Sequence, residues 1–346
     1  MALTEQQIKD ILLKSRLEVT HKFEVPPTCL EIVNEEEHES AIFGTFGNFS
    51  TLVAAPKVGK TTLVAIPVAS YLTKRRIAGF EAKAPKGKEK ILWIDTEQGK
   101  NEAVNTLKAI CSFADLPHDK QPENLIYFPF REYSHSLRVQ LIDYLINHTP
   151  NLGLVVIDGI RDLINSINDE REATMINEKL LKWSEQKQIH IITILHQNKG
   201  DGNARGHLGT ELMNKAETVV TLSKDVQSGE RQTVIEAKHT RHQDFRNFAI
   251  VLRNNRPQLV GVSEYLPSNP KVDQLTGNQK IEIVKAVFDS GSFLPYSKLW
   301  QTIKIKLKEV CSIEFGDNKC KDLAKTLVKE SFIIYNEETK HYQKSV

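Results

Sequence analysis

Short apolar runs alternate with longer amphipathic segments between about residues 49 and 222 of the chain. Runs such as Ile91–Ile94 and Leu152–Ile157 suit strands that are covered on both faces of a sheet. Segment 168–188, by contrast, carries apolar residues at helical spacing. Because strands and helices alternate, the pattern predicts an α/β fold around a central, mostly parallel sheet.

The same pattern divides the chain into four parts. Residues 1–27 are predicted to contain a short amphipathic helix, which either packs locally or docks on a neighbouring subunit. Residues 28–262 form the α/β domain, and residues 263–275, which contain two prolines, form a linker. Residues 276–346 are predicted to form a smaller α+β domain with three helices followed by two short strands.

The stretch between the first strand of the α/β domain's core and the helix after it has the pattern of a phosphate-binding loop. Such a turn directs backbone N–H groups and the positive end of the helix dipole at one point, where a polyphosphate binds. In this pattern Lys60 reaches the β and γ phosphates and the Thr61 hydroxyl binds Mg²⁺. Alanine replaces the first glycine of the pattern, and the alternative is a helix start that a lysine caps. The predicted phosphate-binding residues are Ala54, Ala55, Pro56, Lys57, Val58, Gly59, Lys60, Thr61 and Thr62.

Polar residues end three of the predicted strands, at the sheet edge where α/β folds bind their ligands. Glu97 follows the strand at 91–94 and is a candidate general base, with a solvated loop acid as the alternative. Asp158 ends the next long apolar run and is suited to hold Mg²⁺ together with Thr61. His196 ends a further strand, where it is either structural or a sensor of the γ-phosphate.

Composition narrows the class of protein without naming a partner. Charged residues make up 26% and hydrophobic residues 40% of the chain, which is typical of a globular protein, and a net charge of +2 provides no general attraction for nucleic acid. The four cysteines are widely spaced and show no zinc-binding pattern. No stretch approaches the roughly 18 apolar residues of a membrane helix, and the first 18 residues lack a signal-peptide core. We therefore expect a cytoplasmic protein with reduced thiols and no membrane contact.

Basic residues gather in two places after the strand that His196 ends. Residues 199–208 form a glycine-rich segment that is either a surface loop or a contact that changes with hydrolysis. Strands are then predicted at Thr218–Leu222 and Thr233–Ala237, with Lys238 and Arg241 just past the second. The candidate DNA-contacting residues of the glycine-rich segment are Lys199, Arg205 and His207.

Taken together, these residues resemble RecA-like P-loop ATPases, specifically the hexameric helicases of the DnaB and plasmid RepA type, over about residues 28–260. The resemblance implies that Glu97, in Trp93-Ile94-Asp95-Thr96-Glu97, polarises the attacking water. It also implies that Asp158 is the Walker B aspartate and that His196 matches the histidine or glutamine that ends the next strand. ATP and Mg²⁺ would then bind at the subunit interfaces of a ring, which is a hexamer in that family.

The same family contacts single-stranded DNA through a pore loop, which would correspond to about residues 200–209. It also inserts a lysine and an arginine into the neighbouring subunit's site. Lys238 and Arg241 match that pair, although their spacing is one residue wider than is usual, so the finger is one of Lys238, Arg241 and Arg246. Residues 192–222 further resemble the RepA-like ATPases of mobilisable transposons, which implies a role in excision, mobilisation or replication of a mobile element.

The C-terminal segment resembles a winged helix, because three predicted helices precede a predicted hairpin. It contains 12 lysines against 9 acidic residues, a local net charge of +3. The lysines of the third helix are candidates for phosphate contacts whose strength falls with salt. Winged helices also dock proteins, so a DNA partner and a protein partner both stay open. The candidate DNA-contacting residues here are Lys319, Lys321 and Lys325.

The sequence thus predicts an ATPase that forms a ring and acts as a helicase or translocase on single-stranded DNA. An alternative is an ATP-switched DNA-binding regulator, or a mobilisation accessory protein, that does not unwind DNA. A small-molecule kinase built on the same phosphate loop is disfavoured, because Lys238 and Arg241 would have no role in it.

Overall fold

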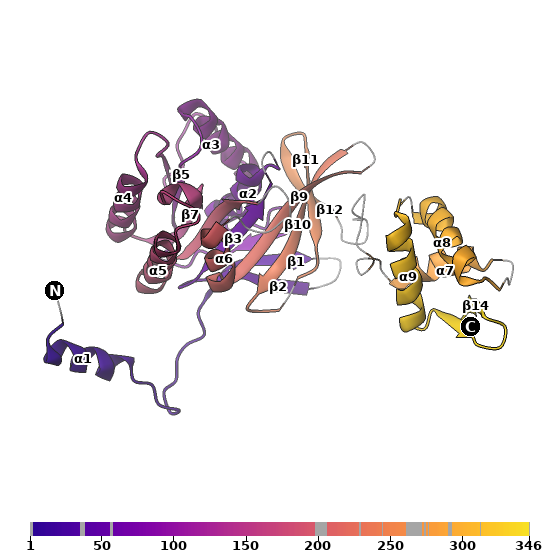
Figure 1. Ribbon diagram of the computed structural model, residues 1–346. Helices are drawn as coiled ribbons and strands as arrows, with labels where there is room; N and C mark the ends of the chain where they lie inside the picture. Colours follow the sequence, from indigo (N-terminus) through magenta and orange to yellow (C-terminus); the bar gives the residue numbers. More distant parts are fainter. Residues whose placement is uncertain are drawn as a thin grey trace.

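The protein is described by a computed structural model with two groups of elements (Figure 1). Each group has its own apolar core. The larger group contains the phosphate loop, and the smaller one is C-terminal. The structure describes residues 3–34, 39–55, 58–197, 206–227, 230–243, 245–260, 272, 275, 277–289, 293–311 and 313–345.

A nine-stranded sheet, in the order β12-β11-β10-β9-β3-β8-β7-β5-β6, is the centre of the larger group. The strands from β9 to β6 in that order are mutually parallel, and β10, β11 and β12 are antiparallel additions at one side. This arrangement confirms the predicted α/β fold with a large, mostly parallel sheet. The strands are β3 (Phe49–Ala54), β5 (Lys90–Asp95), β6 (Leu125–Pro129), β7 (Leu152–Asp158), β8 (His190–His196), β9 (Thr218–Gln227), β10 (Glu230–Thr240), β11 (Phe248–Arg253) and β12 (Arg256–Val260).

Helices cover both faces of the sheet, which explains why its central strands read as continuous apolar runs. One apolar cluster packs α2 and α3 on one face, with Val64, Val68 and Ile110 fully buried. A second cluster packs α4, α5 and α6 on the other face, with Ile142 and Leu180 fully buried. The covering helices are α2 (Lys60–Thr73), α3 (Lys100–Ala114), α4 (His135–His148), the 3₁₀ turn η1 (Ile160–Leu163), α5 (Glu170–Lys187) and α6 (Gly206–Lys215).

A small antiparallel sheet of β1 (Thr28–Asn34), β2 (Glu39–Thr45) and β4 (Phe80–Ala82) packs beside the start of the central sheet. A buried carboxylate joins the two sheets. Glu217 accepts hydrogen bonds from Thr45 N at 2.8 Å, Thr45 Oγ1 at 2.7 Å and His242 Nε2 at 2.9 Å. His190 packs against Gly44, where a Cβ atom would lie 2.2 Å from the imidazole ring. The contact therefore requires glycine for reasons of space.

The hairpin of β9 and β10 is longer than the sequence pattern predicted. Pairing runs from Thr218↔Thr240 to Gln227↔Glu230, so Lys238 lies within β10 and not past it. The prediction ended each strand where polar residues begin. Backbone hydrogen bonding continues through those residues because the ladder joins backbone N–H and C=O groups and does not depend on apolar side chains.

The N-terminal helix α1 (Glu5–Ser15) forms as predicted, and Thr4 and Gln7 make the reciprocal hydrogen bonds of a capping box. None of its residues is buried, and Ile8, Ile11 and Leu12 are exposed. Whether it docks on a neighbouring subunit stays a prediction.

The C-terminal group contains three helices and a hairpin in the predicted order. Leu299, Ile303 and Leu323 lie at the centre of its own buried cluster. Leu294 bridges to Tyr342 of the hairpin. The predicted linker lies outside the described residues, except for Val272 and Leu275. The elements are α7 (Gly277–Val287), α8 (Tyr296–Cys311), α9 (Asp317–Lys329), β13 (Ile333–Asn336) and β14 (His341–Lys344).

Among the described residues, no helix is long and apolar enough to cross a bilayer. All four cysteines are free thiols, and three of them, Cys29, Cys111 and Cys320, are buried.

Candidate nucleotide site

The phosphate loop lies where β3 passes into α2. Gly59, immediately before the helix, has a φ of +88°, a left-handed conformation that glycine adopts without a steric penalty. Lys60 begins the helix, and only 7% of its surface is exposed. A helix start without a side-chain cap leaves its backbone N–H groups available for an anion. Pro56 and Lys57, which were predicted to belong to the loop, lie outside the described residues.

The structure brings Lys60, His196 and Glu97 together in one chain of contacts. Lys60 Nζ lies 2.7 Å from His196 Nδ1, and His196 Nε2 lies 3.0 Å from Glu97 Oε1. With Nδ1 accepting from the ammonium group, Nε2–H donates to the carboxylate. The hydrogen bond from His196 lowers the pKa of Glu97, and burial lowers the pKa of Lys60 against the opposing effect of Glu97 and Asp158. Glu97 is therefore held ionised beside the loop, as a general base requires.

Thr61 and Asp158 form the second contact, with Thr61 Oγ1 donating to Asp158 Oδ2 at 2.8 Å. Asp158 is 2% exposed, and burial together with the neighbouring Asp95 raises its pKa to about 7. A hydroxyl and a buried carboxylate oxygen next to a phosphate loop are the ligands that Mg²⁺ takes alongside phosphate oxygens. The donor set therefore fits Mg²⁺, whose charge would favour the ionised form of Asp158.

Asp95 and Gln98, to which sequence reasoning assigned no role, support this site from the end of β5. Asp95 is fully buried and accepts from the backbone N–H groups of Glu97 and Gln98 at 3.0 and 2.9 Å, and from the Tyr127 hydroxyl at 2.6 Å. Gln98 Nε2 in turn donates to Thr61 Oγ1 at 3.3 Å. These bonds hold the turn that presents Glu97. An Asp followed by a polar turn is a sequence signal for such an arrangement.

Thr96 fastens this turn to the end of β7. Its Oγ1 lies 3.1 Å from the carbonyl oxygen of Asp158 and 3.0 Å from that of Gly159. Gly159 has a φ of +100°, and a Cβ there would lie 2.2 Å from Thr96 Oγ1. The two acidic strand ends are thus locked together, and a side chain at position 159 would separate them.

Lys238 and Arg241 are not brought to this site within one chain. Ala54 of β3 pairs with Leu222 at the phosphate-loop edge, whereas Thr218 pairs with Thr240 at the opposite edge of the sheet. Arg241 follows directly, and its Nη2 donates to the Lys215 carbonyl oxygen at 2.8 Å. Lys238 Nζ lies 3.5 Å from Glu236 Oε2. Neither residue therefore faces the chain's own phosphate loop.

The predicted DNA-contacting residues lie in varied surroundings. Lys199 and Arg205 are outside the described residues, and His207 is exposed in the first turn of α6. On α9, the ammonium groups of Lys319 and Lys321 lie over the rings of Phe315 and Trp300, at 5.1 and 5.0 Å from the ring centres. Lys325 is exposed and lies 3.7 Å from Asp322.

Comparison with known proteins agrees with the geometry. Residues 34–202 match the family model of an AAA domain. The match supports a P-loop ATPase. It includes Lys60, Glu97, Asp158 and His196 and ends before the β9–β10 hairpin and the C-terminal group. This type of domain implies nucleotide binding, typically with Mg²⁺, and suggests ATPase activity. A search of curated proteins found no match to the chain.

Proposed function

We propose that this protein is an ATP-hydrolysing motor that acts on DNA, as a ring-forming helicase or translocase in replication, excision or mobilisation of a mobile element. The observation that carries the ATPase part is the continuous contact from Lys60 through His196 to Glu97, with Thr61 and Asp158 beside it. A structural lysine or histidine would not need an ionised carboxylate and a magnesium-type ligand pair at the mouth of a phosphate loop.

Hydrolysis in this site needs positioning and charge neutralisation more than covalent chemistry. Lys60 and the backbone N–H groups at the start of α2 hold the β and γ phosphates. Bound Mg²⁺, held by Thr61 and Asp158, would neutralise developing charge on the phosphate oxygens. Glu97 orients and polarises the attacking water.

His196 links these two halves of the site. Because Lys60 Nζ contacts Nδ1 of the imidazole at 2.7 Å, a γ-phosphate that draws the lysine toward itself would weaken or break this contact. The imidazole then responds to the phosphate while its other nitrogen still faces Glu97. We propose that His196 reports the γ-phosphate in this way.

Ring assembly is supported by the position of the candidate finger residues. Lys238 and Arg241 lie toward the sheet edge that faces away from the chain's own phosphate loop, so a role for them in hydrolysis requires a neighbouring subunit. In a ring, the site of one subunit would be completed by Lys238, Arg241 or Arg246 of the next. The predicted hexamer follows the resemblance to DnaB and RepA helicases.

DNA contact is supported by basic residues in two regions. The glycine-rich segment contains Lys199 and Arg205. It directly follows β8, and therefore follows the proposed sensor His196. The C-terminal group, which we propose to be a winged helix, has a net charge of +3 between residues 276 and 346. It would bind DNA, or a protein partner, through the exposed side of α9.

The test is steady-state ATP turnover with and without single-stranded DNA for the wild type, Glu97→Gln and Arg241→Ala, together with the native mass of each. We expect DNA to stimulate the wild type and each variant to lose roughly 10³-fold in turnover while keeping the assembled mass. Full turnover by Arg241→Ala in an assembled ring would remove the finger assignment.

The second candidate is an ATP-switched DNA-binding regulator, which the independent core of the C-terminal group favours. Strand displacement on a forked duplex separates the two. A helicase releases the displaced strand in an ATP-dependent way, whereas a regulator shows ATP-dependent binding to the same fork without displacement.

A further inference from the structure

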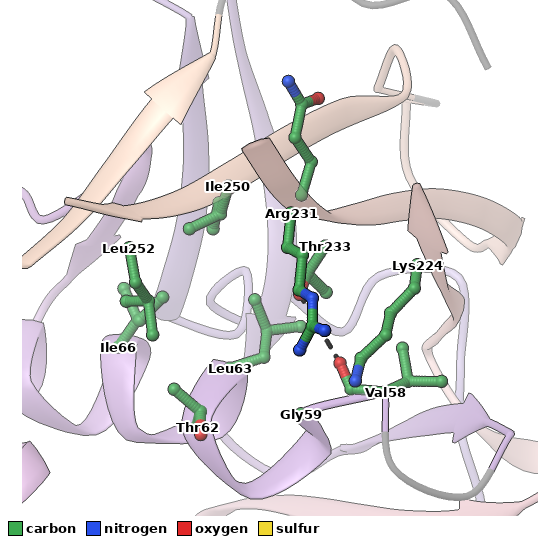
Figure 2. Close-up of a pocket in the computed structure, with 11 residues that line it drawn as sticks. Val58, Gly59, Thr62, Leu63, Ile66, Lys224, Arg231, Thr233, Ile250 and Leu252 are labelled. Carbon is green, nitrogen blue, oxygen red and sulfur yellow. Dashed lines mark hydrogen bonds between the residues drawn. The ribbon is translucent and has the colours of Figure 1, made fainter. Parts of the chain in front are cut away.

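A cavity of about 310 Å³ adjoins the phosphate loop at Val58 and Gly59 (Figure 2). Val58, Gly59 and Thr62 form its border with the loop. The volume is at the lower end of the roughly 300–1,000 Å³ of small-molecule sites, which suits one part of a nucleotide more than the whole. The remaining lining comes from α2, β9, β10 and β11: Leu63, Ile66, Lys224, Arg231, Gln232, Thr233, Ile250 and Leu252.

The order of strands in the sheet shows which part of a nucleotide this cavity faces. β3, which leads into the phosphate loop, lies between β8 and β9. Glu97, Asp158 and His196 all come from the β8 side, and they mark the end of the site where the terminal phosphate is cleaved. The cavity lies on the β9 side. A triphosphate whose γ-phosphate points to Glu97 therefore has its other end directed at the cavity.

The lining is apolar with two cations. Leu63, Ile66 and Ile250 come from opposite sides of the cavity and present aliphatic surface. Figure 2 shows Arg231 and Lys224 reaching from β10 and β9 toward Val58 and Gly59. Within the described part of the chain, neither side chain forms a hydrogen bond or an ion pair. The guanidinium group is thus free to stack on a planar ring.

Few groups in the lining can read the edge of a base. Thr62 and Thr233 supply hydroxyls, and Thr233 Oγ1 already lies 3.5 Å from the Val58 carbonyl oxygen. Gln232 borders the cavity, but as the residue between Arg231 and Thr233 on a strand it directs its side chain to the opposite face. Strong selection of adenine would require an acceptor aimed at its amino group, since discrimination depends on buried polar groups that the wrong ligand leaves unpaired.

We propose that this cavity receives the nucleobase and ribose of the bound triphosphate, that Arg231 stacks on the base, and that the site does not select adenine over guanine. The proposal rests on the proposed function, because it takes the phosphate loop to bind a nucleoside triphosphate. Stacking on a guanidinium group is tolerant of base identity, because every base offers a π face. Arginine and lysine donors also suit the N7 and O6 acceptors of guanine.

The first experiment separates the base from the phosphates. Affinities for ATP and for inorganic tripolyphosphate, both with Mg²⁺, are measured by calorimetry on the full chain for the wild type, Arg231→Ala, Leu252→Ala and the control Arg171→Ala, whose exposed side chain lies at the start of α5. We expect Arg231→Ala to lower the affinity for ATP about tenfold and the affinity for tripolyphosphate less than twofold. Leu252→Ala, at a half-exposed position, should lower the affinity for ATP about threefold and leave the affinity for tripolyphosphate unchanged. Equal losses for both ligands, or no loss for either, would overturn the proposal.

The second experiment compares kcat/KM for ATP and GTP in the wild type. We expect the two values to agree within about tenfold, because stacking without edge recognition discriminates weakly. A larger preference for ATP would show that the site selects adenine and would overturn this part of the proposal. Failure of the proposed function has a different signature: neither ATP nor tripolyphosphate would bind, and Lys60→Ala would change nothing.

Discussion

Two glutamate–histidine pairs lie at opposite edges of the central sheet, and their chemistry differs although their geometry is the same. Glu97 and His196 are 3.0 Å apart with about a third of each side chain exposed. Glu217 and His242 are 2.9 Å apart, but the Glu217 side chain is only 1% exposed. The first pair faces the phosphate loop, and the second joins two sheets.

The difference lies in the remaining partners. The oxygens of Glu217 are also taken by the Thr45 amide and hydroxyl, so the carboxylate is saturated by protein donors. Both oxygens of Glu97 lie near His196 Nε2, at 3.0 and 3.3 Å, and about a third of the side chain is exposed, so its remaining lone pairs are open to a water molecule. A glutamate–histidine pair therefore indicates catalysis only where the carboxylate can still accept a hydrogen bond from water or from the substrate. The largest expected effects of mutation should follow this division.

Replacing Glu97 should affect activity alone. We expect Glu97→Ala to lower kcat by roughly 10³-fold, because general-base catalysis contributes about 10² to 10⁴. Phosphate release measures the loss. The free energy of unfolding in urea should change by less than about 1 kcal/mol, since the pair is exposed to solvent. Normal turnover, or a large loss of stability, would contradict the division between the two pairs.

Replacing Glu217 should affect stability instead. Glu217→Ala leaves the Thr45 amide, the Thr45 hydroxyl and His242 without their acceptor, and we expect a loss of about 3 kcal/mol in the free energy of unfolding. Urea denaturation measures it, and Glu97→Ala is the matched control at the other edge. Equal stability of the two variants would show that burial does not distinguish the pairs.

The junction of the two sheets offers a steric test of the same idea. Gly44→Ala places a methyl group 2.2 Å from the His190 ring, and the buried ring cannot move freely. We expect a loss of about 2 kcal/mol in the free energy of unfolding. Gly277→Ala, which has open space around its Cβ position, is the control and should change it by no more than about 0.5 kcal/mol. Equal results would mean that the small sheet yields to the added methyl group.

The smallest expected effect comes from Gln98, which acts on the site through its contact with Thr61. Gln98→Ala removes the bond to Thr61 Oγ1 at 3.3 Å and should lower kcat about fivefold. The Mg²⁺ concentration for half-maximal turnover should rise in parallel, because Thr61 is held less firmly as a ligand. An unchanged magnesium dependence would make Gln98 a packing residue only.

The sequence was sufficient to select the side chains that the structure brings together beside the phosphate loop. Lys60, Glu97, Asp158 and His196 follow local patterns: a loop between strand and helix, or a polar residue that ends an apolar run. The same local reasoning stopped the β9 and β10 strands too early, because it cannot see that a partner strand continues to pair. It also passed over Asp95, whose role depends on where the neighbouring backbone N–H groups point.

Sequence by itself thus determined the α/β class, the phosphate loop and the acidic strand ends, since helical and strand periodicities are set by neighbours within a few residues. Only the tertiary structure decided the order of the strands. That order places His196 between Lys60 and Glu97, sends Arg241 to the far edge and opens a cavity beside Thr62. Parallel strands are joined by long crossovers, so their order depends on packing between residues far apart in the chain, which no local pattern records.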